Sequence, residues 1–148
     1  MVTSASGPAG NFGQASCSAA KMALVGLMHT LGIEGGRRDV RVNCLAPVGL
    51  TRMNAQFLSD EERCIFDPAK IAPGVVFLAS DGAPMRVVLM GGGGSFERSY
   101  TTFTRGCLLE EGTAEELSGR FETISDRRQK FIPNDANAQV LNEILNLK

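Results

Sequence analysis

The chain has 148 residues, of which 43% are apolar and 21% charged, with a formal net charge of −1 at pH 7. This length and balance are typical of one folded domain, and the near-neutral charge gives no electrostatic basis for binding nucleic acid. No apolar run reaches the roughly 18–20 residues of a membrane span, and no charged-then-apolar leader is evident, so we expect a cytoplasmic protein with no membrane partner.

The first elements are the end of a strand, a loop and a long helix. Val2-Thr3-Ser4 has strand character, and the glycine-rich stretch over residues 7–13 predicts a loop. A helix then begins near Ser16 and ends at Gly35-Gly36, where glycine is a good stop signal. Because apolar residues surround nearly all of this helix, we expect it to be buried on several sides.

An apolar run over Asp39–Ala46 predicts a parallel strand that is covered on both faces. A helix, a short turn and such a strand together favour an α/β fold. A short helix is expected around Asn54–Arg63, and Thr51 is a suitable N-cap residue for it.

Asp67 and Pro68 predict the start of the next helix, as N-cap and first helical residue, and Asp81-Gly82 predicts its end. Met85–Met90 is a further strand, which Gly91–Gly94 closes. Four glycines could form a phosphate-binding loop, but no Gly-Lys-Ser/Thr follows them and no helix is expected after them, so a turn is the better interpretation. Two more helices are predicted, one starting at Thr113 with Glu116 as its capping-box partner, and one over Asn137–Leu147.

Metal and disulfide chemistry have little support in the sequence. The four cysteines lie far apart and form no Cys-x-x-Cys pair, which predicts thiols in a reducing compartment: Cys17, Cys44, Cys64 and Cys107. His29 is the only histidine and has no neighbouring ligand cluster, so we expect a surface or packed residue there.

One stretch of the long helix resembles a known family. Ser18-Ala19-Ala20-Lys21, preceded by Gly10-Asn11-Phe12-Gly13-Gln14-Ala15, is similar to the catalytic helix of the short-chain dehydrogenase/reductase family. That family has Tyr-x-x-x-Lys here: the tyrosine exchanges a proton with the substrate oxygen, and the lysine lowers the tyrosine pKa and holds the nicotinamide ribose. A spacing of four places both residues on one helix face. In this chain Lys21 is present, but Cys17 occupies the tyrosine position.

The resemblance extends to both sides of this helix. The family's substrate-orienting serine, thirteen residues before the tyrosine, corresponds to Ser4, although a residue so near the start is expected to fray. Arg41-Val42-Asn43 and Pro47-Val48-Gly49 match the next strand and the loop against the nicotinamide, and the resemblance makes residues 51–66 a mobile substrate lid. Thr51-Arg52-Met53 resembles the hydroxyacyl-CoA members, especially the multifunctional-enzyme type, which also has a tail after the glycines. The resemblance is strong from Ser4 to Met53 and weak after Met90.

The resemblance implies a truncated Rossmann-like α/β fold with about three parallel strands and without the dinucleotide-binding half. We expect a single domain over residues 1–148, with a core at 1–94 and a helical extension at 95–148. Ser4, Cys17 and Lys21 are then vestigial catalytic positions, with no cofactor-binding and no metal-binding residues in this chain.

The resulting hypothesis is a catalytically inactive subunit of a heteromeric, NAD-dependent 3-hydroxyacyl-CoA dehydrogenase. Its partner would be a full-length short-chain dehydrogenase that binds NAD, in a heterotetramer that covers the exposed sheet edge and helix faces. One candidate substrate is the 2-[hydroxy(phenyl)methyl]succinyl-CoA of anaerobic toluene degradation. The alternatives are a thiol or redox enzyme that uses Cys17 beside Lys21, a non-enzymatic scaffold, and a gene fragment.

Overall fold

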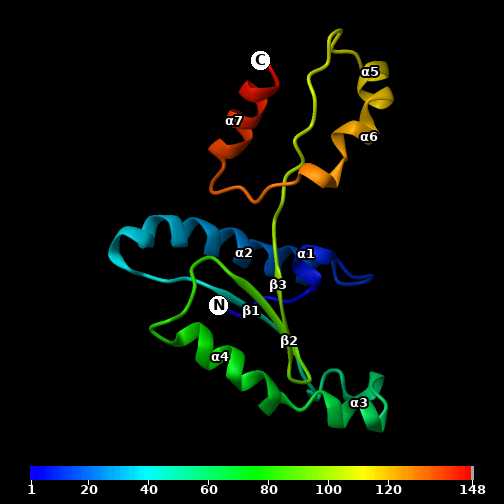
Figure 1. Ribbon diagram of the computed structural model, residues 1–148. Coiled ribbons are helices and arrows are strands. Elements are labelled where there is room, and N and C mark those ends of the chain that lie inside the picture. The colour runs from blue at the N-terminus through cyan, green and yellow to red at the C-terminus, as the bar shows by residue number, and fades with distance from the viewer. Residues whose placement is uncertain (148) are drawn as a thin grey trace. The chain divides into compact units, whose positions relative to one another are not determined.

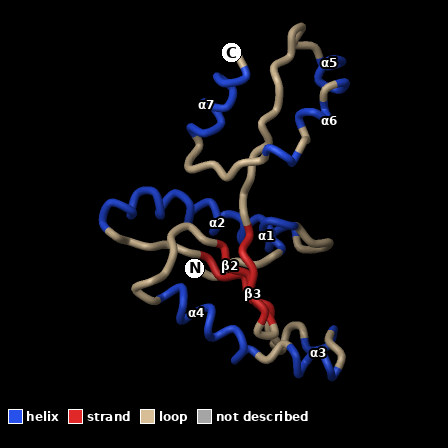
Figure 2. Tube along the Cα trace, in the orientation of Figure 1, coloured by secondary structure: helices blue, strands red, loops and turns tan. Residues whose placement is uncertain are grey.

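The computed structural model describes residues 1–147. The chain divides into two compact units, Met1–Ser99 and Tyr100–Lys148 (Figures 1 and 2). The first unit contains a sheet with helices, and the second contains three short helices and extended segments. The candidate catalytic positions all lie in the first unit.

The sheet has three strands in the order β1-β2-β3: β1 (Cys44–Val48), β2 (Val88–Gly92) and β3 (Ser95–Ser99). β1 and β2 are parallel, with Cys44 opposite Val88, which confirms the predicted α/β class. The expectation of parallel strands throughout is wrong, because β3 is antiparallel to β2. Gly93 and Gly94 have φ of 61° and 88°, the left-handed backbone of a tight two-residue hairpin, and they turn the chain straight back.

The N-terminal segment joins the other edge of β1. Val2 forms a parallel bridge to Leu45, and the Thr3 N–H donates to the Leu45 carbonyl over 2.8 Å. The strand end predicted at Val2-Thr3-Ser4 is therefore present, but only as a single bridge. The predicted loop begins later than expected, because Ser6–Ala9 is a short helix, α1, before the left-handed glycines Gly10 and Gly13.

The long helix α2 (Ala15–Gly35) has the predicted bounds, but not the predicted burial. Only Val25, Met28 and Gly32 are buried, while Leu27 is 47% exposed and Ile33 48% exposed. The sheet covers one face of α2, and Figure 1 shows α4 (Ala72–Ala79) on the opposite side of the sheet. By length and composition the helix through residue 38 could also cross a membrane, which the sequence pattern did not predict.

The core of the first unit lies between α2 and the sheet. Val25, Met28, Cys44 and Val88 form one buried cluster, with Val42 packed against it. Asn43 is also buried: its amide nitrogen donates to the Pro84 carbonyl over 2.7 Å, and its amide oxygen accepts from the Val87 N–H over 2.9 Å. The structure therefore ties the start of β1 to the segment that leads into β2.

Capping residues decide where the elements between β1 and β2 begin. α3 (Asp60–Ile65) starts after Ser59, whose side chain accepts from the Glu62 N–H while the Glu62 carboxylate accepts from the Ser59 N–H. Thr51 is therefore not the N-cap that we expected; its hydroxyl donates to the Asn54 side chain over 3.0 Å. The predicted Asp67 cap is confirmed, since its carboxylate accepts from the Ala69 N–H over 2.9 Å at the 3₁₀ turn that precedes α4.

The second unit contains α5 (Ala114–Gly119), α6 (Phe121–Ile124) and α7 (Asn137–Asn146), which confirms both predicted helix starts. The Thr113 side chain accepts from the Glu116 N–H over 3.1 Å, as predicted. The Glu116 carboxylate differs from the expected capping box, because it accepts from three backbone N–H groups, those of residues 110, 111 and 112. These hydrogen bonds, the one from Glu110 first, lower the pKa of Glu116.

Candidate active site

The three vestigial positions come from adjoining elements. Ser4 lies two residues before the start of α1, and Cys17 and Lys21 lie one turn apart at the start of α2. Positions i and i+4 share a helix face, so the predicted common face for Cys17 and Lys21 is retained. Cys17 is exposed, whereas Ser4 and Lys21 are partly buried.

Ser6 connects Ser4 to Cys17. The Ser6 hydroxyl lies 3.1 Å from the Ser4 hydroxyl oxygen and donates to it, and the Ser6 N–H donates to the same oxygen over 3.3 Å. The Ser6 oxygen also lies 3.9 Å from the Cys17 sulfur. Ser6 is buried, and nothing in its sequence position singled it out. The turn of α1 brings it to α2, so only the folded chain identifies it as part of this cluster.

Lys21 is used to anchor the N-terminal segment. Its ammonium group donates to the Val2 carbonyl over 3.2 Å, and its own carbonyl accepts from the Thr3 hydroxyl over 2.7 Å. The terminal ammonium of Met1 donates to the Asn43 carbonyl over 2.8 Å. The expectation that Ser4 frays is therefore wrong, because hydrogen bonds hold the residues on its N-terminal side to both α2 and β1.

These contacts limit what Cys17 can do. The Cys17 sulfur is bonded directly to Cβ and lies close to the helix backbone. The hydroxyl of a tyrosine at the same position would lie further from the backbone by the length of an aromatic ring. A thiol is also a weak hydrogen-bond donor. Among the hydrogen bonds of residues 1–147, the Lys21 ammonium donates to the Val2 carbonyl and not to the Cys17 thiol.

Cys44 belongs to the core of the first unit. Cys44 is fully buried, its thiol donates to the Leu24 carbonyl over 3.7 Å, and burial raises its pKa, as in a structural core residue. Residues 1–147 contain no group of three His, Cys, Asp or Glu side chains that could hold a metal ion.

A dinucleotide would need a phosphate-binding turn between a strand and a helix N-terminus. The glycine cluster does not provide one, because Gly93 and Gly94 connect two antiparallel strands. The hydroxyl and the N–H of Thr51 are both hydrogen-bonded to the Asn54 side chain. Gly91–Gly94 therefore do not form the phosphate-binding turn of a dinucleotide site.

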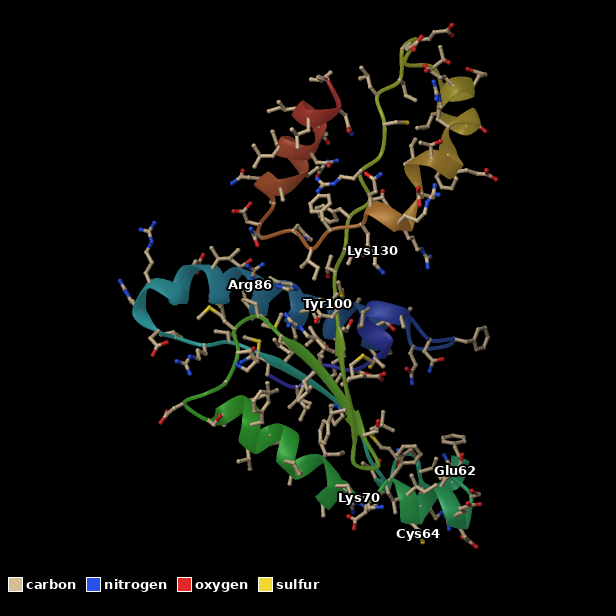
Figure 3. The ribbon with its side chains drawn as sticks, viewed as in Figure 1. Glu62, Cys64, Lys70, Arg86, Tyr100 and Lys130 are labelled. Carbon is tan, nitrogen blue, oxygen red and sulfur yellow. The ribbon has the colours of Figure 1, made fainter. Side chains whose placement is uncertain are left out.

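His29 lies further along α2, away from these residues. Its Nδ1 is buried and has no hydrogen-bond partner within the part of the chain that the structure describes. Burial, and secondly the charge of Arg86, lower the pKa of His29 below its ordinary value of 6.5. The stem of Arg86 crosses Gly32, where an added Cβ would clash with the Arg86 Cγ (Arg86 is labelled in Figure 3). The neutral imidazole is therefore the form that this packing accommodates.

His29 should make the stability of the first unit depend on pH. Its pKa is lower in the folded chain than in the unfolded chain, so the unfolded state binds more protons as pH falls below 6.5. The contribution is fully present above that pH and is lost progressively as pH falls toward the folded-state pKa. Urea unfolding at pH 7.5 and 5.5 should show a smaller decrease for His29→Gln than for the wild type; equal decreases would contradict this assignment.

The comparisons with known proteins agree with the residue pattern. The family model described as short chain dehydrogenase matches residues 1–62. A short-chain type dehydrogenase/reductase of Mycobacterium tuberculosis is 35% identical over 131 residues, which cover 85% of this chain and 45% of that protein. Peroxisomal multifunctional enzyme A of Dictyostelium discoideum is 30% identical over 141 residues, covering 95% of this chain and 32% of that protein.

A solved structure extends the likeness to the whole fold. The full-length peroxisomal multifunctional enzyme type 2 of Drosophila melanogaster matches with a TM-score of 0.80 and 26% identity, over 99% of this chain and 27% of that chain. The match therefore includes the tail after the glycines, as the resemblance implied. This chain spans less than half the length of each of these relatives. Together, the active-site pattern, the fold and these matches show that the chain is similar to proteins of the short-chain dehydrogenase/reductase family.

Proposed function

We propose that this chain acts as a non-catalytic subunit of an NAD-dependent 3-hydroxyacyl-CoA dehydrogenase. The single observation that carries the proposal is Cys17, which stands where the resembled family has its proton-donating tyrosine and lies against Ser6. A full-length short-chain dehydrogenase would supply the tyrosine, bind NAD and oxidise the substrate. The two chains would form a heterotetramer in the cytoplasm.

The exposed apolar side chains of the first unit support an assembly role. Leu27 and Ile33 on α2 are about half exposed, and on the other side of the sheet α4 exposes Val75, Val76 and Phe77. Apolar patches of this kind mark interaction surfaces when they are contiguous. Helices of a partner subunit packed on α2 and α4 would remove these side chains from water.

The hydroxyacyl-CoA substrate class is supported by Thr51-Arg52-Met53 and by the similarity to peroxisomal multifunctional enzymes. Within that class, 2-[hydroxy(phenyl)methyl]succinyl-CoA is our candidate for the substrate of the assembly. Activity assays of the complex should therefore compare this compound with a straight-chain 3-hydroxyacyl-CoA.

The decisive experiment is native mass spectrometry after co-expression with a full-length short-chain dehydrogenase from the same organism. We expect a mixed oligomer in which NAD is bound only to the longer chain. Val76→Glu should weaken the mixed oligomer, whereas Arg52→Glu, on the exposed loop after β1, serves as the matched surface control. Separate oligomers of each chain under these conditions would refute the proposal.

A second test restores the missing side chain. The isolated Cys17→Tyr chain should show no NAD reduction with 3-hydroxyacyl-CoA substrates, because a tyrosine alone does not create a cofactor site. NADH absorbance measures the reaction, and the co-purified complex is the positive control. Turnover by the isolated variant would contradict the assignment of NAD binding to the partner.

A further inference from the structure

The second unit contains an open hollow of about 470 Å³ with the side-chain chemistry of a phosphate site. Three hydroxyl groups and two cationic side chains surround it, and no carboxylate lies among its lining residues: Thr102, Thr104, Ile124, Ser125, Arg127 and Lys130. Hydroxyl, guanidinium and ammonium donors are the groups that bind phosphate oxygens most strongly in proteins. All residues that line the hollow belong to the second unit, whereas the catalytic positions Ser4, Cys17 and Lys21 belong to the first.

Two of the hydroxyl groups are held by a short paired segment. Phe103 and Phe131 form an antiparallel bridge in which each N–H donates to the other carbonyl over 2.9 Å. Their rings pack edge to face with centroids 5.9 Å apart, and the Arg105 guanidinium lies 4.5 Å from the centre of the Phe131 ring. Because side chains alternate along an extended segment, Thr102 and Thr104 lie together on the face opposite Phe103.

The carboxylate next to the hollow, that of Asp126, is neutralised by an ion pair with Arg128. Asp126 accepts from the Arg128 side chain, and their closest atoms lie 2.7 Å apart. This hydrogen bonding lowers the pKa of Asp126, so its carboxylate stays ionised and its charge is balanced by Arg128. No salt bridge involves Arg127 or Lys130 among residues 1–147. The charges of Arg127 and Lys130 are therefore available to bind an anion in the hollow (Lys130 is labelled in Figure 3).

A second hollow of about 410 Å³ shares Thr102 and Thr104 with the first, and it has a different chemistry. Phe103, Gln139, Asn142 and Glu143 complete its lining, so it offers one aromatic residue, two amide side chains and one carboxylate. A carboxylate repels phosphate, but amide and carboxylate oxygens accept hydrogen bonds from the amino group of a nucleobase. The two hollows together match a base next to a phosphate group.

We propose that the cationic hollow binds the 3′-phosphate of coenzyme A, with the adenine directed to the amide-lined hollow. The assignment rests on the proposed hydroxyacyl-CoA function, which brings a CoA thioester to the assembly. Arg127 and Lys130 supply the charge, and Thr102, Thr104 and Ser125 supply neutral donors. The 3′-phosphate is the recognised group, because a phosphomonoester carries the higher charge density.

Isothermal titration of the full chain at low ionic strength tests this site, with CoA, dephospho-CoA and inorganic phosphate as the ligands. We expect CoA to bind at least about tenfold more tightly than dephospho-CoA, since charge-assisted hydrogen bonds to the 3′-phosphate are lost in the latter. Arg127→Gln combined with Lys130→Gln should remove that difference. Arg120→Gln, a charge loss at the junction of α5 and α6, should leave it unchanged.

Circular dichroism of each variant confirms that loss of binding is not loss of folding. Equal affinities for CoA and dephospho-CoA, or binding of inorganic phosphate as tight as that of CoA, would overturn the CoA assignment. The mixed oligomer is measured separately on the wild-type chain, whose CoA selectivity is compared with it. If the oligomer forms and CoA selectivity is absent, the phosphate site is wrong and the subunit proposal stands; if selectivity is present without a mixed oligomer, the reverse holds.

Discussion

Met28→Ala should lower the free energy of unfolding of the first unit by about 2–5 kcal/mol, the range for removing a large aliphatic side chain from a core. Met28 is fully buried, and it belongs to the cluster that joins α2 to β1 and β2 through Cys44 and Val88. Truncation loses its contacts and leaves a cavity, and the size of the loss depends on how far the surroundings relax into it. Urea unfolding followed by circular dichroism measures the change.

The matched control for this variant is Met22→Ala on the same helix. Met22 is 41% exposed, so its truncation removes the same atoms from a site that is already partly in water. Alanine also has the higher helix propensity, which offsets part of the loss. We expect an effect under about 1 kcal/mol. Similar effects of the two substitutions would mean that α2 does not pack on the sheet through Met28.

Asn43→Ala should destabilise the first unit by about 2–4 kcal/mol, because it leaves two backbone groups without partners, each with a cost of roughly 1–3 kcal/mol when buried. The Asn43 amide serves both the Pro84 carbonyl and the Val87 N–H, and the latter hydrogen bond is buried. Without it, the segment leading into β2 is held to the start of β1 only by backbone hydrogen bonds, from the Arg86 N–H to Val42 and from the Cys44 N–H to Val87. The Val87 amide proton should also exchange faster with solvent, which NMR hydrogen exchange detects.

Asn142→Ala provides the comparison for this prediction. The Asn142 amide also donates to a backbone carbonyl, that of Arg105, over 2.8 Å, but the contact is exposed. Water can replace the lost donor there, so we expect a change within about 0.5 kcal/mol. If Asn142→Ala cost as much as Asn43→Ala, burial would not be the reason for the Asn43 effect.

The core residues Met28 and Asn43 also help to position the candidate active site. Met28 fixes the middle of α2 against the sheet, and the Met1 and Thr3 contacts fix the N-terminal segment against β1 and the first turns of α2. Ser4, Ser6 and Cys17 are brought together by this arrangement. Destabilising the core should therefore loosen the cluster even though neither Met28 nor Asn43 touches it.

Much of the local structure could be predicted from the sequence, because its signals act over three or four residues. The glycines at 35 and 36 end α2, Asp67 caps the turn before α4, and Thr113 caps α5. The spacing of Cys17 and Lys21 likewise places them on one helix face, whatever the helix packs against. The family's catalytic motif can be found in the sequence for the same reason, because its residues lie four positions apart on one helix.

Tertiary structure decided the features that depend on which surfaces meet. β3 is largely exposed and polar, so no apolar alternation marks it, and it exists because the Gly93-Gly94 hairpin returns the chain along β2. Ser6 reaches Cys17 only through the turn of α1, and the Glu116 carboxylate finds backbone N–H groups of a preceding loop. α2 is apolar nearly all round, yet the sheet covers only one of its faces. Composition determines how much apolar surface a helix has, whereas packing determines how much of it leaves water.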